Sequence, residues 1–175
     1  TEFTQMFAEG ATGPFFDLDY VVANPNGNTA PITMSFLGPG GLIGTKTYSL
    51  PARTRLRVDA ELLANDFPAI ADTAVSAVVV SDDARPLVAE RAMFWDGSRY
   101  GGHAGTPVEG PSEDWYFAEG SQGFFDTFLL LANPSASKAA TVEVRFLVEG
   151  GAPLTATYAV APNSRQNVWA AEFPS

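Results

Sequence analysis

The sequence contains no cysteine, one histidine and few charged residues, and each shortage excludes a class of protein. Without cysteine, the 175-residue chain has no disulfide, thiolate ligand or thiolate nucleophile. Only 17% of the residues are charged, and 10 basic residues stand against 20 acidic ones. No basic cluster can neutralise a phosphate backbone, so we expect no nucleic-acid partner. No apolar run approaches the ~18 residues of a membrane span, so we expect no membrane insertion.

The shortage of histidine also argues against catalysis. The single histidine, His103, lies in the glycine-rich run "YGGHAG", which we expect to be a flexible loop. A hydrolase triad needs a histidine beside an activated serine, and no G-x-S-x-G turn is present. We therefore predict that the protein is not an enzyme and that His103 is a structural residue.

Metal ligands are few. Asp17 and Asp19 lie two residues apart on one face of an expected strand, and Asp82 and Asp83 share an expected turn. Carboxylate oxygens suit calcium, but no D-x-D-x-D-G spacing is present. We predict no cofactor, with calcium as the weaker alternative.

What the sequence does contain is a pattern written twice. "QMFAEGATGPFFDLDYVVANP" near the start corresponds to "DWYFAEGSQGFFDTFLLLANP" about 110 residues later. Matches continue through Phe36 and Phe146, Tyr48 and Tyr158, and Arg55 and Arg165. The segment that follows Phe67 in the first copy, "AIADTAVSAVVVSDDARPLVAERAMFW" with the glycine-rich run after it, has no counterpart in the second. The chain therefore holds about one and a half tandem repeats.

Hydrophobic periodicity predicts short strands. Ile32, Met34 and Phe36 alternate with polar residues, and "VEVRFL" at 142–147 repeats this pattern. "FDTFLLL" is apolar on both faces, as a central strand would be, and "DAELLANDF" predicts a helical turn or two. About seven short strands per full repeat indicate an all-β, immunoglobulin-like Greek-key sandwich. We expect a full sandwich at 1–104, a Gly/Pro-rich linker at 105–113 and an incomplete second sandwich at 114–175.

These motifs resemble a repeat family of large secreted or surface-attached bacterial proteins. The segments "WYFAEG", "LLLANP", "ERAMFW" and "GGH" are similar to that family's pattern WYFAEG…LLLANP…SR…ERAMYW…GGH. The chain departs from it with "MFAEG" in the first copy and "RTR" in place of "SR", and its second copy lacks the ERAMYW…GGH half. The resemblance implies a secreted or cell-surface, non-catalytic building block present in tandem copies, of largely uncharacterised function.

Charged residues inside apolar motifs predict internal ion pairs. Glu9 and Glu119 occupy matching positions, as do Arg55 and Arg165, and Arg91 lies between apolar neighbours in "LVAERAMFW". A charge among apolar residues must be paired, and guanidinium with carboxylate gives a specific pair. We predict that Glu9 contacts Arg55 or Arg91, and that Glu119 contacts Arg165 or Arg91.

Two further groups of residues leave alternatives open. Arg53, Arg55 and Arg57 alternate on one strand face, which favours a solvated face over a small anion site. Five aromatic residues could form a sugar-stacking platform, although packing is their commoner use: Trp95, Tyr100, Trp115, Tyr116 and Trp169.

Repetition without catalytic residues favours a structural or adhesive module whose partners are neighbouring repeats or copies of itself. A sandwich lacking its last strands has open edges that invite pairing, so self-assembly is the sharper form of this hypothesis if the native chain ends near Ser175. If the chain is a piece of a longer array, we expect the half-repeat to pack on the first domain instead. The alternative is a carbohydrate-binding module that contacts surface glycans through aromatics near the 95–103 loop and 114–116.

Overall fold

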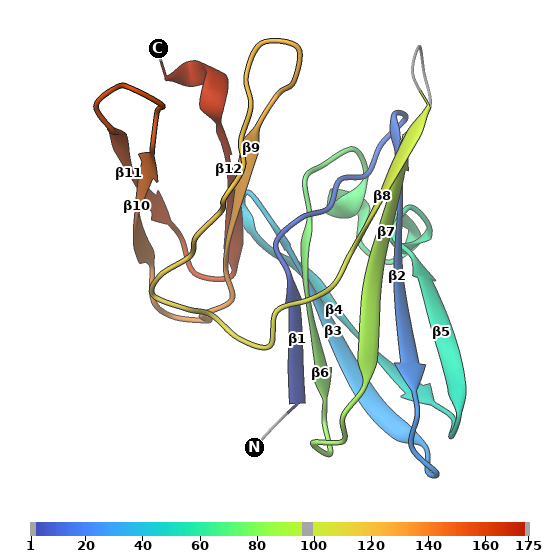
Figure 1. The fold of residues 1–175 in the computed structure, drawn as a ribbon. Helices are drawn as coiled ribbons and strands as arrows, with labels where there is room; N and C mark the ends of the chain where they lie inside the picture. Colours follow the sequence, from blue (N-terminus) through green and yellow to red (C-terminus); the bar gives the residue numbers. More distant parts are fainter. Residues whose placement is uncertain (1–2, 96–99, 174–175) are drawn as a thin grey trace.

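The computed structural model describes residues 3–95 and 100–173 and shows an all-β protein built from antiparallel sheets (Figure 1). Two groups of strands are visible, which we call the N-terminal unit (residues 3–105) and the C-terminal unit (residues 128–173). The segment between them, 106–127, holds no strand beyond a single bridge between Val108 and Met6. None of the described helices is long and apolar enough to cross a membrane.

The N-terminal unit consists of two four-stranded sheets. The first has the order β1 (Phe3–Phe7), β6 (Ser76–Ser81), β3 (Ala30–Gly38) and β4 (Gly41–Leu50). The second has the order β5 (Thr54–Asp59), β2 (Phe16–Asn24), β7 (Val88–Trp95) and β8 (Gly101–Gly105). Two short 3-10 helices, η1 (Leu62–Asn65) and η2 (Pro68–Ile70), connect β5 to β6 where the sequence predicted a helical turn or two.

The core lies between these two sheets. Ile32, Met34 and Phe36 of β3 are fully buried, and they belong to the same apolar cluster as Leu18 and Tyr20 of β2. Their alternation with partly exposed residues is the two-residue period that the sequence predicted. Burial of one face of each sheet therefore fixes the register of β2 and β3.

The C-terminal unit consists of two separate two-stranded sheets. One pairs β9 (Phe128–Asn133) with β12 (Ser164–Trp169), and the other pairs β10 (Ala140–Phe146) with β11 (Leu154–Val160). A short 3-10 helix, η3 (Ala170–Glu172), follows β12. The described part of this unit has no counterparts of β6, β7 and β8.

The two units share a local arrangement at their Ala-Asn-Pro motifs. Ala132 of β9 lies opposite Arg165 of β12, as Ala23 of β2 lies opposite Arg55 of β5. The Asn24 amide donates to the carbonyls of residues 28, 50 and 51 at 2.9–3.0 Å. The Asn133 amide donates to those of residues 138, 160 and 161 at 2.8–3.1 Å. In both units a buried asparagine therefore connects two segments by hydrogen bonds: the turn that follows its own strand, and the end of a later strand.

One expectation for the second copy is wrong. The run "FDTFLLL" predicted a central strand, but β9 pairs with β12 alone among the described strands, and Phe128 is exposed. The strand has the apolar composition of a central position without the second neighbour that such a position requires.

Candidate functional site

The tripeptide Ala8-Glu9-Gly10, which directly follows β1, is where side chains from both units meet. Arg91 of β7 reaches it first, and its Nη2 donates to Glu9 Oε2 at 2.6 Å. The Arg91 side chain is only 3% exposed, whereas that of Glu9 is 35% exposed. Glu9 therefore supplies the charge that a nearly buried guanidinium needs.

His103 of β8 is a second acceptor for the Arg91 guanidinium. Its Nδ1 lies 2.7 Å from Arg91 Nη2 and 3.5 Å from Glu9 Oε2. Because a guanidinium can only donate, Nδ1 is the acceptor in the contact with Arg91. Gly105 faces Arg91 across the β7–β8 pair, and a Cβ there would lie 2.8 Å from Arg91 Nη2. The absence of a side chain at Gly105 thus leaves room for the Arg91 guanidinium.

The expectation that His103 lies in a flexible loop is therefore wrong, because it belongs to an edge strand. Glycines in β8 face larger residues of β7, with Trp95 opposite Gly101 and Phe94 opposite Gly102. The run that looks like a loop in the sequence is a strand shaped to receive its neighbour's side chains.

Tyr20 lies on the core side of the same tripeptide. Its side chain is fully buried, and a Cβ on Gly10 would lie 3.0 Å from the Tyr20 hydroxyl and 2.6 Å from the carbonyl oxygen of Val75. Only glycine fits at position 10 for this reason. Burial raises the pKa of Tyr20 above its usual value, an effect that the positive charges of Arg91 and Arg165 oppose.

Arg165 reaches the tripeptide from the other unit. Its Nε donates to Ser76 Oγ at 3.0 Å, and its Nη2 donates to the carbonyl oxygen of Ala8 at 3.2 Å. Ser76 Oγ donates to the same carbonyl at 2.6 Å, so this oxygen accepts from both side chains. Arg165 is 3% exposed. One arginine of β12 thereby connects the C-terminal unit to the ends of β1 and β6.

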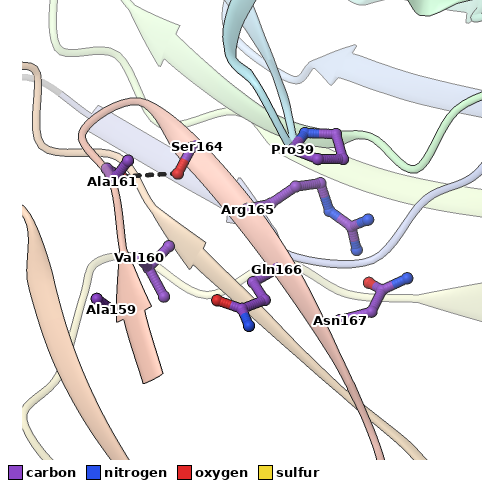
Figure 2. A pocket seen from close by; sticks show the side chains of 8 residues that line it. All are labelled: Pro39, Ala159, Val160, Ala161, Ser164, Arg165, Gln166 and Asn167. Atoms are coloured by element: carbon purple, nitrogen blue, oxygen red, sulfur yellow. Dashed lines mark hydrogen bonds between the residues drawn. The ribbon is translucent and has the colours of Figure 1, made fainter. Parts of the chain in front are cut away.

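The surroundings of Arg165 form the junction between the units. Figure 2 shows its side chain extending from β12 on the side of Pro39, which lies in the turn between β3 and β4. A cavity of about 330 Å³ opens beside it, lined by Pro39 and residues of β11 and β12. Burial lowers the pKa of Arg165 to about 10, against the opposing effects of Tyr20 and Glu9, so the guanidinium is charged at neutral pH.

Three buried polar atoms in this region have no hydrogen-bond partner among the described residues. They are the Tyr20 hydroxyl, Arg91 Nη1 and Arg165 Nη1. Together with Glu9 they make a polar cluster, which we call the junction cluster: Glu9, Tyr20, Arg91, His103 and Arg165. It contains two guanidinium groups and one carboxylate, and no serine or cysteine activated by a base. Its charged and hydrogen-bonding groups suit a structural role, in which they connect separate segments of the chain.

The predicted glutamate–arginine contacts have different outcomes. Glu9 contacts Arg91, whereas Arg55 is exposed on β5. The predicted contact of Glu119 with Arg165 or Arg91 is wrong. Glu119 is exposed in the connecting segment, because that segment has no strand pairing to hold it against a core, and Arg165 donates to Ser76 and Ala8 instead.

Ser76, Ala8 and Tyr20 are contacts that sequence reasoning missed. Ala8 contributes only a backbone carbonyl, which no side-chain pattern can reveal. Ser76 begins a strand that is apolar up to Ser81, and Tyr20 is a tyrosine, with a polar hydroxyl, on a buried face. Each of these two residues is only weak evidence in the sequence for a contact between buried polar atoms.

The arginines and acidic residues that were candidates for anion or metal binding do not form a binding site among the described residues. Arg57 lies 2.7 Å from Asp19 and 3.4 Å from Asp59, so its charge is neutralised in place of binding an anion. Arg55 is exposed on β5, as a solvated strand face predicts. The prediction that Arg53 shares this face is wrong, because Arg53 is exposed in the turn before β5, where its φ is 56°. Within residues 3–95 and 100–173, no group of three histidine or acidic residues is placed to hold a metal ion.

The candidate sugar-binding aromatics do not share one environment. Trp95 is half-buried and packs edge-on against Phe16 at 6.5 Å. Tyr100, Trp115 and Tyr116 are exposed, Tyr116 most of all at 90%. Residues 96–99 of the predicted binding loop lie outside the described residues. Trp169 stacks on Phe128 at 6.0 Å, and its Nε1 donates to Asp126.

The strand edges of the C-terminal unit are a second candidate site. In the N-terminal unit, β6 pairs with β1 and β3, and β7 pairs with β2. In the C-terminal unit, the described strands leave the corresponding edges of β9 and β10 uncovered (Figure 1). Matching side chains differ in exposure: Phe7 of the core cluster is 4% exposed and Phe117 is 72% exposed, and Leu37, which lies outside that cluster, is 1% exposed and Leu147 is 81% exposed. The uncovered edges and these residues make up what we call the open face.

A comparison with solved structures supports the fold. The crystal structure of Thermotoga maritima 1070 is similar, with a TM-score of 0.54 at 15% sequence identity. The similarity covers 62% of this chain and 97% of that one. At this identity the likeness concerns the fold alone. No protein-family model and no curated protein matches the chain.

Proposed function

We propose that the chain is a non-catalytic, secreted or cell-surface structural module, built from immunoglobulin-like β-sandwich repeats and assembling through open strand edges. The observation that carries this proposal is the open face of the C-terminal unit. Unpaired backbone groups along β9 and β10 offer hydrogen bonds to another strand, and exposed apolar side chains offer area to bury. The resemblance to bacterial surface repeats agrees with this role.

The junction cluster supports the same proposal. Arg165 lies on β12 at the position that Arg55 occupies on β5, and it fixes one unit against the other through Ser76 and Ala8. A module that connects neighbouring units needs a contact of this kind. Its buried guanidinium also makes the docking geometry specific, because only correctly placed acceptors satisfy it.

Light scattering behind size-exclusion chromatography, across a wide concentration range, tests the proposal. We expect oligomers whose mass rises with concentration, together with slowed amide exchange in β9 and β10. A strict monomer at every concentration, with fast-exchanging edges, would contradict assembly through the open face.

Carbohydrate binding is the second candidate, favoured by the exposure of Tyr100, Trp115 and Tyr116. Exposed rings can stack on sugar faces. A glycan array would give saturable signals that a Tyr116→Ala and Trp115→Ala double variant loses. A blank array removes this candidate.

A further inference from the structure

The open face corresponds to the strand edges that β6 and β7 cover in the N-terminal unit. This correspondence indicates which kind of polypeptide segment can cover it. β6 lies between β1 and β3, and β7 covers the free edge of β2. Phe117 corresponds to Phe7 at the end of β1, and β9 and β10 correspond to β2 and β3 by sequence and by the pairing of β9 with β12. Among the described residues, all three lack the neighbour that their counterparts have.

We infer that the open face is a receptor for a polypeptide segment built like β6 and β7 of this same protein. This inference rests on the proposed function and names the chemistry of the partner. The segment is a pair of strands joined by a short acidic turn. Its first strand, like "SAVVVS", is apolar on both faces between two serines. Its second, like "VAERAMFW", alternates exposed with buried residues and carries one adjacent pair of charged residues, Glu90 and Arg91.

The register of the N-terminal unit shows how such a donor would pair. β6 contacts β3 from Ile32 to Leu37, and β7 contacts β2 from Phe16 to Ala23. A donor in the same register would pair with residues 142–147 along β10 and with residues 125–132 along β9. Its inward residues, like the buried Ala77 and Val79 of β6, would lie against the half-buried Leu129 and Leu131. Burial of these leucines and of Phe117 would drive the association, and the new backbone pairs would fix the register.

The donor's side chains also distinguish this mode from general apolar adhesion. Val79 points into the core in the N-terminal unit, whereas its neighbour Val78 is only half-buried on the opposite face. A carboxylate at position 79 would have to be buried without a partner, and one at position 78 would remain near solvent. The two positions therefore form a matched pair on one strand.

The test uses the complete chain and a synthetic peptide of residues 73–95. Binding is followed by calorimetry and by amide exchange with mass spectrometry. We expect saturable one-to-one binding that slows exchange in β9 and β10, with β2 and β3 unchanged because their edges are already paired. The Val79→Asp peptide should bind at least about tenfold more weakly than the native peptide, and the Val78→Asp peptide within about threefold of it.

The remaining outcomes separate the inference from the proposed function. If no peptide binds but the chain forms oligomers with protected β9 and β10, a second copy is the occupant, and this inference is wrong while assembly stands. If no peptide binds and the chain is a monomer, both are wrong. Equal binding of the two aspartate peptides would mean unspecific apolar contact and would also overturn the inference.

Discussion

Replacement of Arg165 by alanine tests whether one arginine holds the two units together. The guanidinium donates to Ser76 Oγ and to the Ala8 carbonyl, and it is 3% exposed. The apolar core of the N-terminal unit contains no residue of β12, so the substitution should leave the stability of that unit nearly unchanged. The expected effect is on docking of the C-terminal unit.

The magnitude follows from two opposing effects. Hydrogen bonds from a charged donor contribute about 1.5–3 kcal/mol each, and the loss of two is partly offset because a buried charge is no longer withdrawn from water. A net loss of about 1–3 kcal/mol would lower the ratio of docked to undocked molecules by roughly 5- to 150-fold.

Amide exchange and small-angle X-ray scattering measure this change. Arg165→Ala should speed exchange in β9 and β12 and increase the radius of gyration, while exchange in β2 and β3 stays as in the wild type. Arg55→Ala is the matched control, because Arg55 has the same position on β5 but is exposed. Unchanged exchange and radius in Arg165→Ala, or equal effects of both variants, would refute the reasoning.

Four further substitutions test buried polar contacts. Glu9→Gln removes the charge that faces the nearly buried Arg91 and should lower the free energy of unfolding by about 1–3 kcal/mol in urea titrations, with no loss if the pair is dispensable. Tyr20 contributes a loss of stability above about pH 10, at up to about 1.4 kcal/mol per pH unit, because its raised pKa makes the unfolded state release the proton first. Tyr20→Phe should remove this contribution and leave those of the other titrating groups, and parallel pH profiles of variant and wild type would contradict this. Asn24→Ala removes a buried amide that donates to three carbonyls and should cost about 2–4 kcal/mol, whereas Asn133→Ala should speed exchange only in the C-terminal unit.

The sequence predicts the strands well because their signal is local. The alternation of Ile32, Met34 and Phe36 reflects one buried face, and the structure places all three in the core. The β8 strand was missed because its glycines carry no periodicity. These glycines leave room for the side chains of Arg91, Phe94 and Trp95 on the neighbouring strand, and the sequence alone does not show that these residues face each other.

The junction was predictable only in part. A charge inside an apolar strand, such as Arg91, must find a partner, and the structure pairs it with Glu9. The same reasoning failed for Glu119 and Arg165, because matching positions in two copies do not have matching surroundings. Arg165 has the N-terminal unit beside it, and Arg55 faces solvent.

This difference between Arg55 and Arg165 links the junction cluster to the open face. Arg165 is buried because the neighbouring unit offers a serine on β6 beside the Ala8 carbonyl. The connecting segment 106–127 holds the matching Ala118, but no described strand brings a serine next to it. A donor segment like β6 carries that serine at its start. Completion of the open face would therefore also place a serine hydroxyl beside the Ala118 carbonyl. An arginine in the position of Arg55 in another copy could donate to both groups. Contacts made by strand donation and contacts made by an arginine would then alternate along an assembly.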